Sequence, residues 1–321
     1  MNRKTMLTAI GEALIDFIPD RTGCSFDDVN AFAPKVGGAP TNVCGAFAKL
    51  GGHARLITQV GDDPFGHRIL HTLKDAGVDT SCVLTTDKAN TMLAFVSLQE
   101  DGNRTFSFYR KPSADTLFSA DQIERRWFDD AYALHFCTVS LGDYPFRDAH
   151  RAAIRYAREA GALISFDPNL RFPLWPDRED LSRIIAEFLP QSDILKISDE
   201  ELAFITGETD IEAALPKLFI GRVGLILYTC GGDGAHAYTR TAHAHAPSFA
   251  AGKVIDTTGA GDAFAAAMLW QLANAGVTDL SALDENTLTG MLTLANRYCG
   301  VSVTRSGAIP SYPSAEEFFN Q

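Results

Sequence analysis

Short apolar runs alternate with segments of helical periodicity along most of this 321-residue chain. Such alternation favours βαβ units, in which parallel strands form one sheet and helices cover both of its faces. Strands are expected at Met6–Ile10, Arg55–Val60, Ala133–Cys137, Ala162–Phe166, Ile194–Ile197 and Gly224–Thr229. Helices are expected at Thr41–Leu50, Gly66–Ala76, Asp148–Ala160, Leu181–Leu189, Asp199–Thr206, Ala263–Ala273 and Leu288–Val301. This order predicts a doubly wound α/β fold with a mostly parallel sheet.

Two segments, residues 15–36 and 91–109, interrupt the alternation. The second holds two alternating runs around Asp101-Gly102, a dipeptide typical of a hairpin turn. We predict that both segments form a small β-sheet lid, from about residues 12–36 and 90–110, on a single domain spanning 1–321. A second copy of the chain or a bound ligand would cover its strand edges. The alternative is a hairpin without a functional role.

The chain is acidic, which limits the partners that it can bind. Its 28 Lys and Arg against 40 Asp and Glu give a formal net charge of -12. This charge repels nucleic acids and anionic membranes, so neither is expected as a partner. It does not exclude one nucleotide, because a pocket of backbone N–H groups can hold a phosphate.

The cysteines indicate a reducing compartment. No two of them form a Cys-x-x-Cys pair, so neither a zinc site nor a disulfide framework is predicted. Gly11, Glu12 and Asp16 interrupt the N-terminal apolar residues before they are long enough for a signal peptide. A cytoplasmic enzyme with buried thiols is therefore expected. The cysteines are Cys24, Cys44, Cys82, Cys137, Cys230 and Cys299.

A glycine turn within residues 254–264 carries the strongest chemical signal. Gly259 and Gly261 allow a tight turn that gathers backbone N–H groups, and the following helix adds the positive end of its dipole. This predicts a phosphate cradle with Asp262 at its opening. The helix end should favour ionised Asp262, which would accept a hydroxyl proton while the N–H groups stabilise a transferring phosphoryl group. Alternatively, Asp262 only caps the helix.

The residues just before this turn supply oxygen atoms suited to a hard cation. They are the carboxylate of Asp256 and the backbone carbonyls around Thr258. A monovalent ion bound there would brace the cradle.

A second pair of glycines, Gly37 and Gly38, stands before the first expected helix. The pair permits close approach of a ligand, and Asn42 offers both a donor and an acceptor, which suits sugar hydroxyls. Asp16 would bind hydroxyls in the same way or occupy a plain turn. The alternative for Thr41 or Asn42 is the N-cap of the helix.

The two glycine motifs together resemble the signatures of the ribokinase-like (PfkB) carbohydrate kinases. They are residues 37–42 and 256–262, and the resemblance extends over the whole chain. It implies ATP-dependent phosphorylation of a sugar hydroxyl, with Asp262 as the base and an anion hole at Gly259, Ala260 and Gly261. It also implies that the β lid covers the sugar and joins two copies into a homodimer.

The resemblance further implies sites for ATP, Mg²⁺ and K⁺. Lys196 could meet an ATP phosphate as a point charge. In the family's N-x-x-E element, Glu201 matches the indirect magnesium ligand, whereas Ser198 replaces Asn. The nucleotide residues implied are Lys196, Ser198, Thr229, Gly231, Gly232, Gly234, Gly259, Gly261 and Asn296, although Gly231–Gly234 could equally form a hairpin turn. The potassium residues implied are Asp256, Thr258, Ser302, Arg305, Gly307 and Ser311.

Residues 11–19, 38–42 and 167–171 look most like the fructokinase branch of the family, which implies D-fructose as substrate. Aminoimidazole riboside kinases, 2-keto-3-deoxygluconate kinases and a non-catalytic sugar sensor remain alternatives. Arg171 would fork onto oxyanions or remain a surface residue. Phe95, Phe106 and Phe108 would wall the sugar ring, or else form the core or dimer contact of the lid.

Overall fold

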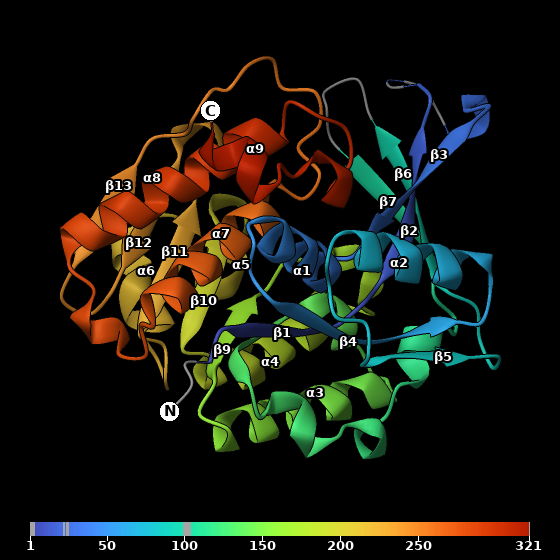
Figure 1. Cartoon of the computed structure of the whole chain (residues 1–321), viewed down its shortest axis with the longest axis horizontal. Coiled ribbons are helices and arrows are strands. Elements are labelled where there is room, and N and C mark those ends of the chain that lie inside the picture. The colour runs from blue at the N-terminus through green and yellow to red at the C-terminus, as the bar shows by residue number, and fades with distance from the viewer. Residues whose placement is uncertain (1–3, 22, 24–25, 99–103, 321) are drawn as a thin grey trace.

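The computed structural model describes residues 4–21, 23, 26–98 and 104–320 (Figure 1). Its main sheet has nine strands in the order β13-β12-β11-β10-β9-β8-β1-β4-β5. Pairing is parallel from β5 to β11 and antiparallel for β11-β12 and β12-β13. The strands are β1 (Met6–Ile10), β4 (Ala54–Gly61), β5 (Val83–Thr86), β8 (Ala131–Cys137), β9 (Leu163–Asp167), β10 (Ile194–Ser198), β11 (Leu225–Thr229), β12 (Ala235–Tyr238) and β13 (His243–Ala246).

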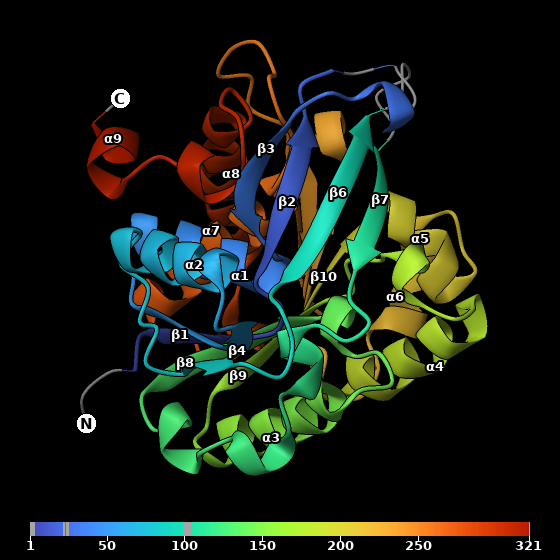
Figure 2. The same ribbon diagram turned by 90° about the vertical axis from the view of Figure 1, so that its right-hand side faces the viewer.

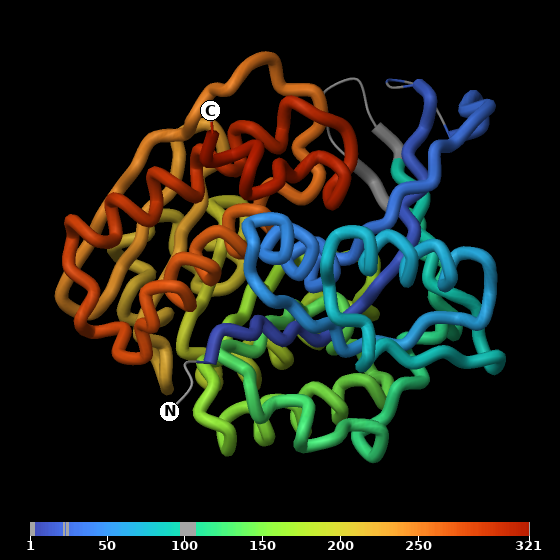
Figure 3. The backbone as a smooth tube through the Cα atoms, viewed as in Figure 1, coloured from blue at the N-terminus to red at the C-terminus, as the bar shows by residue number. Residues whose placement is uncertain are grey.

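Helices cover both faces of this sheet, as Figures 1 and 3 show. The α-helices are α1 (Ala39–Lys49), α2 (Pro64–Asp75), α3 (Pro145–Glu159), α4 (Arg178–Phe188), α5 (Asp199–Thr206), α6 (Ile211–Leu218), α7 (Ala260–Ala275), α8 (Glu285–Ser302) and α9 (Ala315–Phe319). Short 3₁₀ helices are η1 (Phe26–Asp28), η2 (Ala114–Leu117), η3 (Ala120–Gln122), η4 (Arg125–Phe128), η5 (Thr138–Ser140), η6 (Phe172–Leu174), η7 (Leu189–Gln191), η8 (Gly231–Asp233), η9 (Leu280–Ala282) and η10 (Ile309–Ser311).

The core is divided in two by the sheet, because successive strand residues point to opposite faces. On β11, Leu225 and Leu227 belong to the buried cluster that includes residues of α1, α2, α7 and α8, whereas Ile226 belongs to the cluster that includes residues of α3, α4, α5 and α6. The predicted doubly wound α/β fold is confirmed.

A second sheet of four strands forms the predicted lid (Figure 2). Its order is β3-β2-β6-β7, with a parallel central pair, β2-β6, between two antiparallel pairs. The strands are β2 (Leu14–Pro19), β3 (Phe32–Gly37), β6 (Met92–Leu98) and β7 (Arg104–Tyr109). The lid thus combines both segments that interrupt the α/β alternation.

All six expected strands of the main sheet and all seven expected helices are present, but other elements were missed. Strands β5, β12 and β13 lie toward the two edges of the sheet, where fewer apolar residues are needed. Helix α6 contains Pro216, a residue that usually ends a helix, and α9 is only five residues long. Helix α1 begins at Ala39 rather than Thr41, because Pro40 is tolerated in a first turn.

The prediction of buried thiols holds only in part. Cys44, Cys82 and Cys137 are buried, whereas Cys230 and Cys299 are partly exposed. Cys24 lies outside the described residues. No helix within the described ranges is long and apolar enough to span a membrane.

Candidate functional site

A cavity of about 690 Å³ lies between the lid and the carboxyl ends of the parallel strands. Ligands of open α/β sheets usually bind at this edge. The lining residues are Glu12, Leu14, Asp16, Ile18, Gly38, Ala39, Asn42, Val96, Phe108, Val139, Asp167, Asn169, Leu170, Arg171, Phe172, Pro173, Lys196, Glu200, Thr257, Thr258, Gly259, Ala260, Gly261 and Asp262. The structure therefore brings both glycine motifs to one site.

The glycine turn forms the start of α7, as predicted. Gly259 is the N-cap with a φ of 75°, and a Cβ there would overlap the Tyr312 hydroxyl, which donates to the Gly259 carbonyl at 3.0 Å. Amide groups in a first helical turn have no acceptor within the helix. Ala260 N donates to the Thr257 carbonyl at 3.2 Å, so the amides of Gly261 and Asp262 are the ones that can bind an anion. Asp262 is the third helical residue, so the alternative that it is the N-cap is wrong.

Asp262 is buried at the edge of this cavity, with 8% of its surface exposed. Burial and the charge of Asp167 together raise its pKa to about 7, against the opposing effects of the Asn42 hydrogen bond, Lys196 and Arg171. The expectation that the helix end keeps Asp262 ionised is therefore corrected, because loss of water outweighs the helix dipole. A carboxyl with a pKa near 7 is matched to general-base work at neutral pH.

Asn42, in the first turns of α1, points its amide at this carboxylate. Its Nδ2 donates to Asp262 Oδ2 at 2.8 Å. Its Oδ1 is buried and accepts no hydrogen bond from the described residues. Because a buried acceptor without a partner is unfavourable, this oxygen suits a hydroxyl in the cavity. Gly38 is the N-cap of α1, so neither Thr41 nor Asn42 caps the helix.

A buried ion pair lies beside the cradle. Lys196 Nζ is 3.1 Å from Asp167 Oδ2, and both side chains are almost wholly buried. A Cβ at Gly261 would lie 3.2 Å from Lys196 Nζ, which places the ammonium next to the anion cradle. Although burial alone lowers the pKa of Lys196, the neighbouring carboxylates Asp167, Glu201 and Asp262 raise it above its usual value. Lys196 thus presents a fixed positive charge to the cavity.

The lid contributes several, but not all, of its predicted residues. Asp16 and Phe108 line the cavity, and a Cβ at Gly37 would overlap the Asp16 carboxylate. Phe95 lies on the opposite face, where its ring stacks on Phe17 with a centroid distance of 4.7 Å. The backbone of Phe106 pairs with Val96, but its side chain lies outside the described part of the structure. Phe95 therefore belongs to the lid's own aromatic core, the second of the two interpretations.

The other predicted nucleotide residues do not line this cavity. Thr229 ends β11, and Gly231, Gly232 and Gly234 form the connection to the antiparallel β12, so the hairpin interpretation is confirmed. Asn296 on α8 donates its Nδ2 to the carbonyls of Ala246 and Pro247, both at 2.9 Å. Their contact with a nucleotide stays a prediction.

Ser198 and Glu201 form a capping box at the start of α5. Ser198 N and Oγ donate to Glu201 Oε2 at 2.9 and 3.0 Å, while Leu170 N donates to Glu201 Oε1 at 2.8 Å. The residue of this segment that faces the cavity is instead Glu200. The indirect magnesium role of Glu201 stays a prediction.

The two segments predicted to hold potassium lie side by side. Asp256 Oδ1 accepts from Thr258 N at 2.9 Å, and Asp256 Oδ2 accepts from Gly307 N at 2.9 Å. The Ser302 and Ser311 hydroxyls donate to nearby carbonyls, and the Arg305 side chain pairs with Glu317. If Arg305 contributes to an ion site, it therefore does so through its backbone carbonyl and not through its side chain. Elsewhere too, the described side chains of His, Cys, Asp and Glu form no group of three suited to a metal ion.

Comparison with known proteins agrees with this geometry. Residues 4–315 match the model of the pfkB family carbohydrate kinases. The chain belongs to the PfkB family. It is 42% identical over 316 residues to fructokinase-1 of Zea mays, which covers 98% of this chain and 96% of the relative.

Two solved structures resemble this PfkB kinase over nearly their full length. A fructokinase from Xylella fastidiosa with bound ATP has a TM-score of 0.89 and 35% identity, covering 99% of this chain and 98% of the other. A fructokinase double mutant from Vibrio cholerae O395, with fructose, ADP and a potassium ion bound, has a TM-score of 0.88 and 32% identity, covering 100% and 99%.

Sequence reasoning missed two buried carboxylates of this PfkB kinase site, Glu12 and Asp167. Each lies at or just beyond the carboxyl end of a parallel strand, β1 or β9. That position was a usable signal, because side chains at this edge of the sheet converge on the ligand site.

Proposed function

We propose that the chain is an ATP-dependent fructokinase, which converts D-fructose and ATP to D-fructose 6-phosphate and ADP. The observation that carries the proposal is Asp262, a buried carboxyl with a pKa of about 7 beside the amide groups that open α7. A proton acceptor and an anion cradle are the two parts that phosphoryl transfer to a hydroxyl needs.

The reaction is an in-line transfer. Asp262 accepts the proton of the primary hydroxyl of β-D-fructose, whose oxygen then bonds to the γ-phosphorus as the bond to the ADP oxygen breaks. The amide groups of Gly261 and Asp262 donate to the phosphoryl oxygens, and Lys196 adds its positive charge. Asn42 holds the Asp262 carboxylate in place through its 2.8 Å hydrogen bond.

The charges of the nucleotide require cations. Mg²⁺ carried with ATP would neutralise its phosphates. The Asp256 carboxylate accepts hydrogen bonds from Thr258 N and Gly307 N, and so links two segments of the chain next to the cradle. The backbone carbonyl oxygens of these two segments would bind K⁺. An ion there would brace the start of α7.

The lid excludes water, which would otherwise compete with the sugar as nucleophile. Asp16, with Phe108 and Val96, supplies one polar and two apolar side chains on its inner face. Fructose is the proposed sugar because relatives that are 39–42% identical over nearly the full chain, such as fructokinase-1 of Zea mays, are named fructokinases.

The test is ADP release with Mg-ATP and potassium over a panel of sugars. The panel holds fructose, aminoimidazole riboside, 2-keto-3-deoxygluconate, ribose and adenosine, each with an Asp262→Asn control. Turnover restricted to fructose supports the proposal. Preference for another member would retain the mechanism and overturn the sugar, and silence on every sugar would favour a sensor.

We further propose that two copies join through the lid. Its outer face carries an aromatic cluster of five rings, of which Phe26 is 46% and Tyr109 60% exposed. Burying such rings against a second copy would be favourable. Light scattering after size exclusion should show a dimer, which Tyr109→Ser should weaken. The control is Ile220→Ser, a change of an exposed residue beyond α6, which should leave the dimer intact. A monomeric wild-type protein would overturn the proposal. The cluster is Phe17, Phe26, Phe32, Phe95 and Tyr109.

A further inference from the structure

The chain passes between the α/β body and the lid at four places. These are the links β1–β2 at residues 11–13, β3–α1 at Gly38, β5–β6 at residues 87–91, and β7–η2 at residues 110–113. Figure 2 shows the four lid strands rising together from the body at this root. Whatever holds the root also sets where the lid stands over the cavity.

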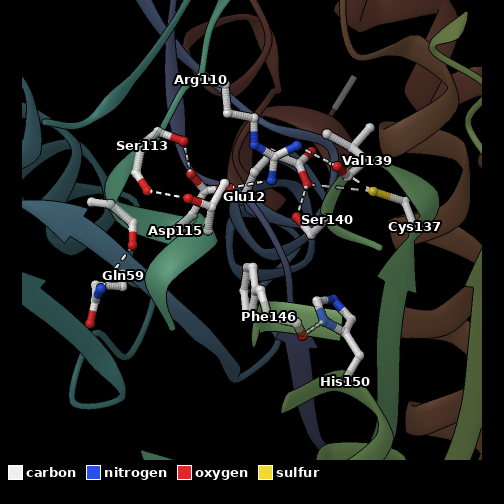
Figure 4. A network of polar contacts seen from close by, with 12 residues as sticks. Glu12, Gln59, Arg110, Ser113, Asp115, Cys137, Val139, Ser140, Phe146 and His150 are labelled. Carbon is white, nitrogen blue, oxygen red and sulfur yellow. Dashed lines mark hydrogen bonds and ion pairs between the residues drawn. The ribbon is translucent and has the colours of Figure 1, made fainter. Parts of the chain in front are cut away.

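One buried carboxylate, that of Glu12, lies at this root and contacts three elements of the body, α1, η5 and β8 (Figure 4). It is 1% exposed and lies within the first link. Its Oε1 accepts from Ala39 N, in the first turn of α1, at 2.9 Å. Its Oε2 accepts from Ser140 Oγ at 2.8 Å, and the Cys137 thiol lies 3.6 Å from the same oxygen.

The backbone of Glu12 holds the same helix. Thr41 Oγ1 donates to the Glu12 carbonyl at 2.8 Å, and a Cβ at Gly38 would overlap that carbonyl oxygen. Gly38, with a φ of 108°, is therefore required for the close approach. Side chain and main chain of Glu12 both fix the start of α1.

The fourth link meets the same cluster. Arg110 directly follows β7, is 4% exposed, and donates to the Val139 carbonyl and to Asp115. Burial raises the pKa of Glu12, and the charge of Arg110, which Figure 4 shows nearby, opposes that rise. Three of the four links thus meet around Glu12.

The start of α1 in turn carries Asn42. Asn42 N donates to the Gly38 carbonyl at 2.8 Å, and its side chain donates to Asp262. A series of contacts therefore runs from Arg110 at the lid root, through the Val139 carbonyl and the adjacent Ser140, to Glu12, α1 and the carboxylate that takes the proton.

We propose that Glu12 is a positioning residue, whose carboxylate fixes the start of α1 so that Asn42 stays on Asp262, and which ties this alignment to the root of the lid. The role rests on the proposed function, since it acts on the same base. Glu12 does not touch the reacting atoms itself.

Two variants separate contact from charge. Glu12→Gln keeps an amide oxygen for Ala39 N and a group that can pair with Ser140, whereas Glu12→Ala removes both contacts. We expect Glu12→Ala to lower kcat by about tenfold to a hundredfold and Glu12→Gln by no more than about threefold. Equal losses in the two variants would overturn the proposal.

The pH profile distinguishes positioning from mere stability. The hydrogen bond from Asn42 lowers the pKa of Asp262, so its loss should move the acidic limb of kcat to higher pH. Both Glu12→Ala and Asn42→Ala should move the limb, and the double variant should move it no further than Asn42→Ala alone. A folded Glu12→Ala protein with the wild-type limb would overturn the proposal.

A direct readout keeps this test independent of the sugar. Titration of the Asp262 carboxyl, followed by carbon NMR in the protein without substrate, should show the same upward shift in Glu12→Ala and none in Glu12→Gln. This outcome stands even if no sugar of the panel is turned over, which would overturn the kinase proposal alone. An unshifted carboxyl in folded Glu12→Ala would overturn the positioning role alone.

Asp193→Asn is the matched control. Asp193 is also a buried carboxylate, which accepts from Ile164 N at 2.9 Å, but it precedes β10 at the opposite edge of the sheet. Its change should lower the thermal midpoint without moving the acidic limb or the Asp262 titration. A similar limb shift in this control would show a general effect of lost stability and overturn the proposal.

Discussion

The start of α7 and the lid face each other across one cavity but are supported differently. Residues 262–269 of α7 are all buried, between the sheet and neighbouring helices. Among the described residues on the cavity side of the lid, Leu14, Met92 and Ala94 form a small buried cluster. The groups that react thus lie on the closely packed α/β body, whereas the lid residues that contact the sugar lie on a sheet with a smaller buried core. Changes at α7 should act mainly on kcat, and changes in the lid mainly on KM.

The largest effect is expected for Asp262→Asn, at the start of α7. The amide cannot accept the hydroxyl proton, so kcat should fall by about a thousandfold while sugar binding is nearly kept, because general-base catalysis contributes roughly 10²–10⁴. Steady-state turnover and calorimetric sugar binding measure the two effects. Turnover within tenfold of wild type would remove Asp262 from its role.

The same variant should be more stable than wild type at alkaline pH. The folded pKa of Asp262, about 7, lies above its unfolded value of 3.8, so the native state holds a proton that the unfolded chain releases. The free energy of unfolding therefore falls as pH rises from about 4 to 7. Asparagine lacks this loss, and Asp262→Asn should gain on the order of 3 kcal/mol at pH 8. Urea unfolding at pH 4 and 8 tests this; an equal difference at both would contradict it.

In the lid, Gly37→Ala should act on binding. The added methyl group would overlap the Asp16 carboxylate and turn it from the cavity. We expect the KM for fructose to rise about tenfold with little change in kcat, because the contact is made before and during reaction alike. A loss confined to kcat would show that the lid takes part in the chemical step.

The smallest effect is expected at Gly290, on the exposed side of α8. A Cβ there meets no atom within 4 Å, and the φ is not positive. Gly290→Ala should raise the free energy of unfolding by about 0.5–1 kcal/mol, since alanine loses less backbone entropy in a helix. Both kinetic constants should stay unchanged; a changed KM would mean that α8 communicates with the site.

The body was more predictable from sequence than the lid for a physical reason. Strands such as β1 and β8 are buried on both faces, so their residues are almost continuously apolar. Strand β13, with the sequence HAHA, has one exposed face and was missed. The direction of Phe95 depends on the strand pattern of β6, since one residue along the strand reverses the face. Asp262 was found because its motif is local.

The contacts of Glu12 could not be found in that way. Its partners, Ala39 and Ser140, lie 27 and 128 residues further along the chain. No periodicity or short motif reports a meeting of that kind, because it depends on how β1, α1 and η5 pack. The position of Glu12 just beyond a strand points to the ligand site, but its partners are visible only in three dimensions.

The parallel β2-β6 pair at the centre of the lid has a consequence for how the chain folds. Leu14 pairs with Met92, which lies 78 residues further along, whereas the β6-β7 hairpin closes locally. Closing so long a loop is unfavourable until the intervening β4, α2 and β5 have condensed. The lid, which covers the sugar, should therefore form after β4, α2 and β5 of the neighbouring body. Native hydrogen exchange should report that order as earlier opening of β2 than of β1.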